Sequence, residues 1–394
     1  MPSFSDHLNQ RLATLRRENL FRELRRIDAP AGPRLVLDGR TLINFASNDY
    51  LGLADHPALK EAAIKSVEKF GAGSGSSRLI CGSSRLFHDL ESALADFKQT
   101  GAALAFSSGY ATAVGTITAL MGKDDIIILD KLVHASIVDA ARLSGAKLRI
   151  FAHNDLNDLE DRLRWASETL ADSRANRSIL VVTESVFSMD GDVAPLRGLV
   201  ELKEKYGAWL MVDEAHALGV LGQHGRGLAD ECGVSRHIEI QMGTLSKAVG
   251  ASGGYICGSR ALVDYLINRA RSFIFSTAPV PAAAGAALAG VQLLQSREGE
   301  QRRQALHQRI HKLRGLIPGR ASEQPLTAIF PVIVGDEARA VNTAARLREN
   351  NIFAPAVRYP TVARGAARLR ISLTAAHSAE DLDALAQNLA RINR

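Results

Sequence analysis

The chain has 394 residues, 46% of them hydrophobic and 23% charged, as in a soluble globular protein with more than one lobe. Its net charge is +6, but basic residues are spread out beyond the N-terminal region and aromatic residues make up only 5%, which argues against a nucleic-acid-binding surface. The N-terminus lacks the apolar stretch of a signal peptide, and the most apolar run, residues 278–294, predicts a buried helix rather than a membrane span. Three widely spaced cysteines, Cys81, Cys232 and Cys257, predict reduced thiols and a cytoplasmic protein.

Leucines at helical spacing predict an amphipathic helix over residues 5–27. Its other face carries six arginines, including Arg25, and is either a solvated face or a docking surface for an acidic partner. Residues 34–45 then predict a β-hairpin around an Asp38–Gly39 turn. Pro57 predicts the start of the next helix. The Gly- and Ser-rich residues 71–84 form either a linker or an ordered ligand loop.

From residue 102 onward, short apolar segments alternate with helical ones. The expected strands are residues 102–106, 125–129, 147–151, 179–183, 208–212, 238–242 and 254–257. Continuous apolar strands separated by helices predict an α/β fold with a mostly parallel sheet covered on both faces.

The C-terminal residues predict a smaller α+β lobe. Its expected strands lie near residues 328–334, 352–356 and 368–373, and its last helix begins at Ser378. We therefore expect three parts, an N-terminal helix and hairpin over residues 1–47, a large domain over 48–282 and a small domain over 283–394.

Lys247 lies in the glycine-rich stretch Gly243–Tyr255, between two predicted strands. Thr244 and Ser246 place hydroxyl groups beside its amine. A lysine held where partial burial disfavours its charge can form a Schiff base. A surface lysine in a mobile loop is the ordinary alternative, so the residues elsewhere in the chain must decide.

Polar residues follow the predicted strands, and ligands of open α/β sheets bind at the carboxyl ends of strands. Ser107–Tyr110 follows a strand and opens a helix, where backbone N–H groups freed by Gly109 would hold a phosphate. His134 and Ser188 also lie beyond strand ends, although His134 would equally suit a helix cap.

Asp213 ends an apolar strand, and His216 follows three residues later. A buried carboxylate at such a position needs a cationic partner. A pyridoxal phosphate enzyme needs a lysine for the Schiff base, a carboxylate to keep the pyridine nitrogen protonated and a phosphate cup. Lys247, Asp213 and Ser108–Tyr110 supply this set, so the cofactor predicted is pyridoxal 5'-phosphate, with no metal.

Three rival motifs are weaker. Asp213–His216 spells a helicase-type box, but the chain lacks a phosphate-binding loop of the P-loop type. Gly250–Gly254 fits a nucleophile elbow around Ser252, yet no clear strand leads into it. Gly71–Gly75 lacks the third glycine of a dinucleotide-binding motif.

Nearly the whole chain resembles the α-oxoamine synthases, a family of fold type I pyridoxal phosphate enzymes. The segments that carry the resemblance are Ser47–Gly52, Val181–Asp192, Asp213–His216 and Gly243–Lys247. The family implies an acyltransferase that condenses an amino acid with an acyl thioester and releases CO2. Pro360–Val362 and Ala367–His377 look most like the members that use L-alanine and a pimeloyl thioester in biotin biosynthesis. Gly253–Tyr255 also resembles glycine- and serine-using members, such as 2-amino-3-ketobutyrate CoA ligase, which stays the alternative.

The resemblance also implies roles for particular residues. Lys247 would bind the cofactor and later remove the Cα proton, and Asp213 would pair with the pyridine nitrogen. His216 and Ser188 would bond the ring hydroxyl, while His134 would stack on the ring and contact the acyl substrate. The other implied cofactor contacts are Gly109, Tyr110 and Thr244, with Ser276 and Thr277 from a neighbouring subunit, so a homodimer is expected.

The implied substrate contacts, besides His134, form two groups. Arg370 and Asn48 would hold the amino-acid carboxylate, and Arg25 and Thr361 would contact the acyl substrate. Whether the acyl group arrives on coenzyme A or on an acyl carrier protein stays open. A non-catalytic paralogue is the remaining alternative, and the intact Lys247 argues against it.

Overall fold

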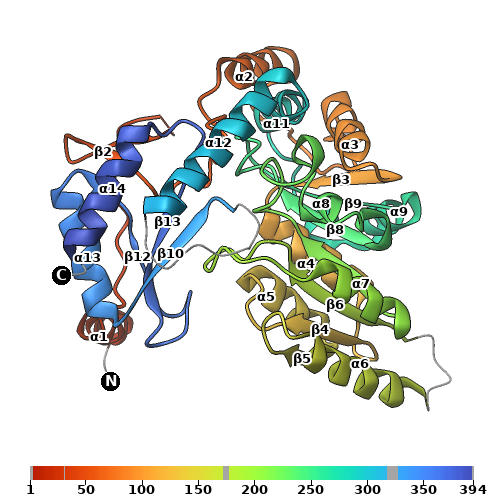
Figure 1. Ribbon diagram of the computed structural model, residues 1–394. Helices are drawn as coiled ribbons and strands as arrows, with labels where there is room; N and C mark the ends of the chain where they lie inside the picture. The colour runs from red at the N-terminus through yellow and green to blue at the C-terminus, as the bar shows by residue number, and fades with distance from the viewer. Residues whose placement is uncertain (1–2, 31, 172–176, 317–326, 393–394) are drawn as a thin grey trace.

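A seven-stranded sheet in the order β3-β9-β8-β7-β6-β4-β5 forms the larger part of the molecule (Figure 1). The structure is a computed structural model that describes residues 3–30, 32–171, 177–316 and 327–392. The strands are β3 (Ala102–Phe106), β4 (Ile126–Asp130), β5 (Lys147–Phe151), β6 (Ile179–Glu184), β7 (Trp209–Asp213), β8 (Ile240–Thr244) and β9 (Gly254–Gly258). Only β9 runs antiparallel to its neighbours, which confirms the predicted mostly parallel sheet.

Helices cover both faces of this sheet (Figure 1). They are α3 (Arg85–Lys98), α4 (Gly109–Leu120), α5 (Ala135–Ser144), α6 (Leu156–Ala171), α7 (Leu196–Lys205), α8 (Leu228–Glu231), α9 (Arg260–Arg269), α10 (Arg271–Ile274) and α11 (Pro281–Leu294). Successive strand residues enter two different hydrophobic clusters, as Ile127 and Ile128 do. Because both faces are covered, the strands are apolar throughout, and this is why they were recognisable in the sequence.

The smaller part contains a second, antiparallel sheet in the order β10-β13-β12 (Figure 1). Its elements are α12 (Arg297–Leu316), β10 (Ile329–Gly335), α13 (Glu337–Glu349), β11 (Ile352–Phe353), β12 (Ala356–Val357), β13 (Ala367–Ser372) and α14 (Ala379–Ile392). The predicted α+β lobe is therefore present, with the region near 352–356 divided into two short strands.

The N-terminal hairpin consists of β1 (Arg34–Leu37) and β2 (Arg40–Asn44). Asp38 and Gly39 both have positive φ, 51° and 74°, so the predicted turn has the geometry that matches strand twist. β2 also pairs in parallel with β11, which joins the start of the chain to its C-terminal part in one sheet. The proposed three-part division of the chain stays a prediction.

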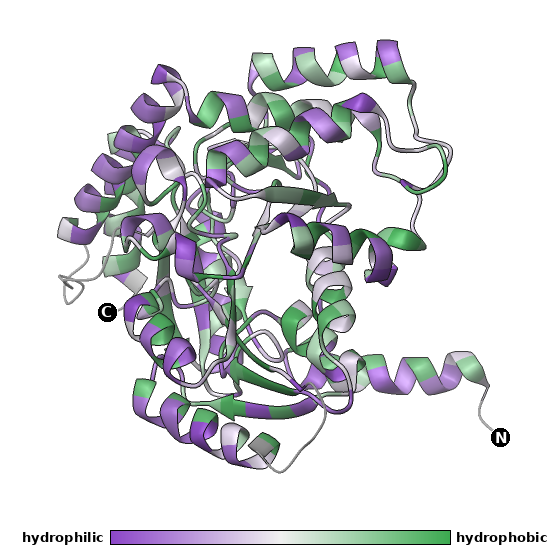
Figure 2. Cartoon of the chain, turned by 90° about the vertical axis from the view of Figure 1, so that its right-hand side faces the viewer, coloured by the Kyte–Doolittle hydropathy of each residue, from purple (hydrophilic) through white to green (hydrophobic). Residues whose placement is uncertain are grey.

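The prediction of one helix over residues 5–27 was wrong beyond α1 (Phe4–Arg17). Asn19 adopts a left-handed φ of 56°, and the Leu20 amide donates to the Leu15 carbonyl at 2.8 Å. This 6→1 bond closes the helix, since asparagine tolerates the left-handed conformation. Arg25 consequently lies on a non-helical segment, while α1 projects from the body of the molecule with none of its side chains buried (Figure 2).

The Gly- and Ser-rich residues 71–84 follow α2 (Pro57–Phe70) as an ordered loop. The Ser74 hydroxyl donates to the Pro279 carbonyl at 2.6 Å, and Ser77 forms an isolated bridge with Thr277. The loop is therefore fixed against the segment that leads into α11. Within the described ranges, the longest apolar helices are still too short or too polar to cross a membrane.

Candidate active site

The predicted site residues gather at the carboxyl edge of the large sheet. Glu184 and Asp213 are register partners at the ends of β6 and β7. Thr244 ends β8, and Ser107 follows the end of β3. The edge therefore brings together residues far apart in sequence, as expected for this class of sheet.

Lys247 lies on the loop between β8 and β9. The Gly250 amide donates to the Lys247 carbonyl at 2.9 Å, and the Leu245 amide donates to the Gly253 carbonyl at 3.0 Å. Gly250 has a φ of +75°, and a Cβ there would come within 2.6 Å of the Leu53 carbonyl carbon. Glycine is thus required for this loop to close against its neighbour.

The Lys247 amine is held in an environment that weakens its charge. Burial lowers its pKa to about 8, although the carboxylates of Asp213 and Glu184 act in the opposite direction. The Nζ atom lies 2.9 Å from Nε2 of His216. An amine that is partly neutral at physiological pH can attack a carbonyl carbon.

Asp213 and Glu184 form a buried pair of carboxyl groups. Burial raises the pKa of Asp213, and the nearby Lys247 opposes that shift. Burial, together with the neighbouring Asp213, raises the pKa of Glu184 to about 8. In the described structure the Oε1 atom of Glu184 lacks a hydrogen-bond partner. The pair therefore favours a cation as its ligand.

Sequence reasoning selected Asp213 and missed Glu184. Both residues end an apolar strand, β7 and β6 respectively, so the same signal was available for each. The pairing of the two strands, which the sequence does not specify, is what places them together.

The segment after β3 forms the start of α4. The Ser108 hydroxyl accepts from the Ala111 amide at 3.1 Å and caps the helix. A Cβ built on Gly109 would lie 3.8 Å from the Cβ of Thr244, so these two predicted phosphate contacts are adjacent. Thr244 Oγ1 is 2.7 Å from the hydroxyl of Ser246. Free N–H groups at a helix start, beside two hydroxyls, suit a phosphate.

Tyr110 directs its side chain away from this cup. Its hydroxyl donates to Asp139 Oδ2 at 3.0 Å, and the ring is exposed. Only the backbone of Tyr110 is therefore placed to contact a phosphate in this chain.

His134 both caps a helix and belongs to the candidate site. Its Nδ1 accepts from the Ser136 amide at 3.2 Å, which caps α5. Burial lowers its pKa, Asp213 raises it and Lys247 lowers it, so His134 belongs to the same electrostatic cluster. As a whole residue, His134 is exposed at the surface.

Arg370 links several loops around the site. It donates from Nη1 to Asn48 Oδ1 at 3.0 Å and from Nε to the Ser188 carbonyl. It also donates from Nη2 to the hydroxyl of Tyr50 at 3.3 Å. Asn48 thus lies beside Arg370, as predicted, and Ser188, which was predicted as a cofactor contact, bonds to Arg370 through its backbone carbonyl.

Tyr50 was not singled out in the sequence, although it lies in the Ser47–Gly52 motif. It is fully buried, and its hydroxyl lies 2.6 Å from Nδ1 of His216. Through this contact Arg370, Tyr50, His216 and Lys247 form one hydrogen-bonded series.

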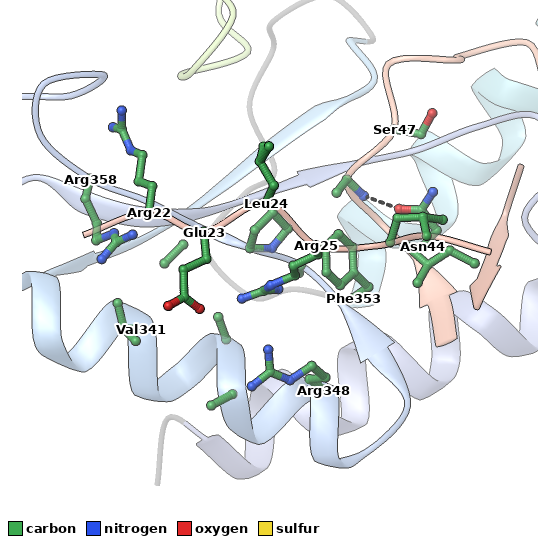
Figure 3. Close-up of a pocket in the computed structure, with 18 of the residues that line it drawn as sticks. Arg22, Glu23, Leu24, Arg25, Asn44, Ser47, Val341, Arg348, Phe353 and Arg358 are labelled. Atoms are coloured by element: carbon green, nitrogen blue, oxygen red, sulfur yellow. Dashed lines mark hydrogen bonds between the residues drawn. The ribbon is translucent and has the colours of Figure 1, made fainter. Parts of the chain in front are cut away.

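Arg25 lies in a separate cavity of about 840 Å³ between the N-terminal segment and the smaller part of the chain (Figure 3). Its guanidinium lies 5.5 Å from the centre of the Phe353 ring. Burial lowers the pKa of Arg25, and the charge of Arg348 lowers it further. Ser47, the neighbour of Asn48, also lines the cavity. The cavity therefore runs from a region of positive charge toward the loop that contacts Arg370.

Three predicted residues lie outside these groups. Thr361 is exposed and accepts a hydrogen bond from Arg22 Nη2 at 3.3 Å. The Ser276 hydroxyl donates to the carbonyl of Thr277 at 3.2 Å. Ser276 and Thr277 share a small cavity with Ser107, and no described contact joins them to Lys247.

The chemistry of these groups fits pyridoxal phosphate. The start of α4 with Thr244 supplies donors for a phosphate, and Asp213 supplies a buried carboxylate for a protonated pyridine nitrogen. Lys247 supplies an amine of lowered pKa on the same edge.

Comparisons with known proteins agree with this fit. The family model for class I and II aminotransferases matches residues 40–389. The chain is 46% identical over 389 residues to the 8-amino-7-oxononanoate synthase of Geobacter sulfurreducens, with 97% of each chain covered. It is 45% identical over 387 residues to the same enzyme of Geotalea daltonii, covering 98% of this chain and 97% of the relative.

Solved structures give the same result. A serine palmitoyltransferase from S. paucimobilis with pyridoxal phosphate bound has a TM-score of 0.90 and 28% identity, covering 99% of this chain and 97% of its own. The 8-amino-7-oxononanoate synthase of Francisella tularensis has a TM-score of 0.72 and 31% identity, covering 89% and 96%. These neighbours have the fold type I architecture that the sequence predicted. The chain therefore belongs to the class I and II aminotransferase family and, within it, to the pyridoxal-phosphate-dependent 8-amino-7-oxononanoate synthases.

Proposed function

We propose that the chain catalyses the decarboxylative condensation of L-alanine with a pimeloyl thioester. The products are 8-amino-7-oxononanoate, CO2 and the free thiol carrier, in a step of biotin biosynthesis. The similarity to synthases of this name over 97% of the chain carries the proposal. The placement of Lys247, Asp213 and Arg370 around one edge of the sheet supports it.

Pyridoxal phosphate, when bound, supplies an electron sink for the electron pair left on the amino-acid Cα as a proton or CO2 departs. Asp213 would keep the pyridine nitrogen protonated, because a buried carboxylate stabilises a cation beside it. Gly109, Tyr110 and Thr244 would hold the phosphate, and His216 would hydrogen-bond the ring hydroxyl. His134, an exposed residue, would stack on the cofactor ring.

Lys247 would hold the cofactor before the substrate arrives and would then move the proton at Cα. Its pKa of about 8 lies close to physiological pH, where one group can serve both as base and as acid. The neighbouring Nε2 of His216, at 2.9 Å, would keep the amine oriented between these two tasks.

Arg370 and Asn48 would bind the alanine carboxylate. Arg370 is 8% exposed, and its guanidinium is fixed by Asn48, Tyr50, Ser188 and Ser372. Such fixed donors hold a carboxylate in one orientation until it leaves as CO2.

The cavity around Arg25 would take the acyl chain. Its apolar lining, which includes Phe353 and Val341, suits methylene groups (Figure 3). The like charges of Arg25 and Arg348 suit a carboxylate at the far end of pimelate. Thr361 would act with this group through Arg22, its hydrogen-bond partner.

A product assay tests the substrates directly. Alanine and glycine are each offered with pimeloyl and acetyl thioesters, and products are identified by mass spectrometry. We expect alanine with pimeloyl to be used best, while glycine reacts slowly, because one methyl group in an apolar niche is worth about 1 to 3 kcal/mol. Efficient condensation of glycine with acetyl-coenzyme A, and none of alanine with pimeloyl, would favour 2-amino-3-ketobutyrate CoA ligase instead.

Arg25→Ala tests the acyl site. It should raise the KM for the acyl thioester and leave alanine binding near normal. Arg26→Ala is the matched control, because Arg26 has an 87% exposed side chain paired with exposed Asp28. Equal effects of the two substitutions would contradict the assignment of Arg25.

An acyl carrier protein is one source of the acyl group, and the arginine-rich N-terminal region would suit its acidic surface. High salt should then depress turnover more with a protein-borne acyl group than with a coenzyme A ester, because salt screens long-range attraction. Equal salt sensitivity for both donors would remove the docking surface from the proposal.

The active form is proposed to be a cytoplasmic homodimer in which Ser276 and Thr277 reach the partner's phosphate. Thr277 is exposed, and apolar side chains near it are exposed as well, namely Leu79, Ile80, Phe275 and Val280. Large exposed apolar side chains of this kind suit an interface. Three free cysteines suit a reducing compartment. An active monomer in sedimentation would contradict the dimer.

A further inference from the structure

Tyr50 is a buried phenol that joins two functional groups. It lies between β2 and α2, and its side chain is completely inaccessible. One of its contacts is Nδ1 of His216 at 2.6 Å, and another is Nη2 of Arg370 at 3.3 Å. A hydroxyl in this position determines how hydrogens are distributed along the series.

The direction of each hydrogen bond follows from the donors available. Arg370 can only donate, so the Tyr50 oxygen accepts from it. The Tyr50 hydrogen can go to His216 Nδ1 at 2.6 Å or to Asn48 Oδ1 at 3.3 Å. The Asn48 oxygen already accepts from Arg370 at 3.0 Å, and the contact to His216 is much the shorter one. The hydrogen therefore points to Nδ1 of His216.

The protonation states agree with this direction. Burial raises the pKa of Tyr50, so the phenol keeps its proton. Burial lowers the pKa of His216 well below its usual value, and the charges of Lys247, Arg370 and His134 lower it further. The imidazole is thus neutral and carries one hydrogen. Because Nδ1 accepts, that hydrogen lies on Nε2. It points to Nζ of Lys247 at 2.9 Å, which accepts it in the neutral form of the amine.

We infer that Tyr50 is a positioning residue that fixes His216 as the Nε2–H tautomer and so turns the nitrogen beside Lys247 into a donor. This part rests on the geometry of Tyr50, His216, Arg370 and Lys247 and on the neutral state of the buried imidazole. A second part rests on the proposed function, in which Nε2 faces the ring hydroxyl of the cofactor. A donor there would stabilise the ring oxygen in its ionised form. Arg370, Tyr50 and His216 would then connect the carboxylate site to that oxygen.

The test compares Tyr50→Phe with Tyr255→Phe. Tyr255 is an equally buried tyrosine, and in the described structure its hydroxyl lacks a hydrogen-bond partner, so it is a matched control. The full-length holoenzyme is labelled with ¹⁵N-histidine, and the His216 signals are identified by their loss in His216→Gln. Wild type and Tyr255→Phe should both show a protonated Nε2 and an unprotonated Nδ1. Tyr50→Phe should shift both His216 nitrogens toward a mixture of tautomers.

Two NMR results would overturn the inference. One is a protonated Nδ1 in the wild type, which decides the matter even if Tyr50→Phe fails to fold. The other is a folded Tyr50→Phe variant whose His216 signals match the wild type.

The pH dependence of the cofactor's visible absorbance tests the second part, the placement of His216 Nε2 at the ring hydroxyl, independently of the tautomer. Losing the donor should raise the pH midpoint of the ring ionisation in Tyr50→Phe by roughly half to one unit, and Tyr255→Phe should leave it unchanged. A tautomer change without a shift of the midpoint would support the role of Tyr50 and would contradict the proposed placement of His216 at the ring hydroxyl.

Discussion

Two carboxylates adjacent in sequence, Asp213 and Glu214, differ in whether the protein supplies a cationic partner. Glu214 is completely buried and pairs with Lys98, whose Nζ also donates to the Arg226 carbonyl. Glu214 accepts a further bond from the Ala229 amide at 2.9 Å. Asp213 accepts from the Ala215 amide at 2.9 Å, and no described residue forms a salt bridge with it. Glu214 thus has its charge balanced within the protein, whereas Asp213 is available to bind a cationic ligand.

The same contrast separates the two lysines. Lys98 has a side chain that is 1% exposed and contacts a carboxylate directly. Lys247 contacts a neutral imidazole, and burial lowers its pKa to about 8. A saturated ion pair serves the fold, whereas an amine and a carboxylate that remain unpaired in the interior favour a functional site. Substituting members of each pair tests this distinction.

The largest effect is expected for Lys247→Ala. Activity should fall by at least about 10⁴-fold, which corresponds to about 5.5 kcal/mol, because the amine would both hold the cofactor and move the proton. The melting temperature should stay near that of the wild type. Borohydride reduction of the wild type should attach the cofactor to the peptide that contains Lys247. Labelling of Lys123 or another lysine instead would refute the assignment.

Asp213→Asn should have the next largest effect. Loss of the charge that keeps the pyridine nitrogen protonated should slow removal of the Cα proton by several orders of magnitude, about 4 kcal/mol or more. The washout of deuterium from Cα-labelled alanine, followed by NMR, measures this step. Wild-type washout in a variant with bound cofactor would show that Asp213 does not have this role.

Lys98→Met should act on stability instead. Removing one partner of a buried pair leaves Glu214 uncompensated and should lower the free energy of unfolding by about 3 kcal/mol. Denaturant unfolding measures this loss, and the rate per folded molecule should stay near normal. A Lys98→Met variant that stays stable but reacts slowly would contradict the distinction between a structural Lys98 and a catalytic Lys247.

His153 pairs through both ring nitrogens with carboxylates, with Nδ1 at 2.9 Å from Asp130 and Nε2 at 2.6 Å from Asp192. Burial lowers the pKa of His153, but the bonds to both aspartates outweigh it and raise the pKa to about 10. The stabilisation should be complete below the unfolded pKa of about 6.5 and should fade as the pH rises toward 10.

His153→Gln should therefore lower the free energy of unfolding by about 2 kcal/mol near pH 6, and by less at higher pH. Unfolding of both proteins at a series of pH values measures the difference. A difference that grows with pH would contradict the charged state of His153.

The smallest effect concerns the pH dependence of cofactor uptake. The neutral Lys247 amine is the reactive form, so uptake by the apoenzyme should rise about tenfold per pH unit below its pKa and level off above about 8. Stopped-flow absorbance follows this reaction. A rate that keeps rising to pH 10 would indicate an ordinary exposed lysine.

The sequence predicted the large sheet well because its strands are apolar on both faces. It failed at the N-terminal helix, where the leucine spacing continues past Asn19 but the backbone turns. No spacing rule detects a left-handed asparagine that a 6→1 bond stabilises.

The candidate site was predicted where a residue type implied a chemistry. Lys247, Asp213 and the start of α4 were selected in this way. Glu184 and Tyr50 were missed because their importance comes from neighbours, Asp213 across the sheet and His216 across a loop. The sequence also carried no sign that Lys98 is buried against Glu214, because that pairing joins residues far apart in the chain.

The antiparallel direction of β9 has a consequence for how the site assembles. β8 and β9 pair from Ile240 with Gly258 to Thr244 with Gly254, joined only by the loop that carries Lys247. Closing a short loop costs little chain entropy, and such low contact order favours early formation during folding. The hairpin should therefore place the reactive amine before the distant residue Arg370 docks. Amide hydrogen exchange within β8 and β9 should accordingly slow as one unit early in refolding, ahead of β13.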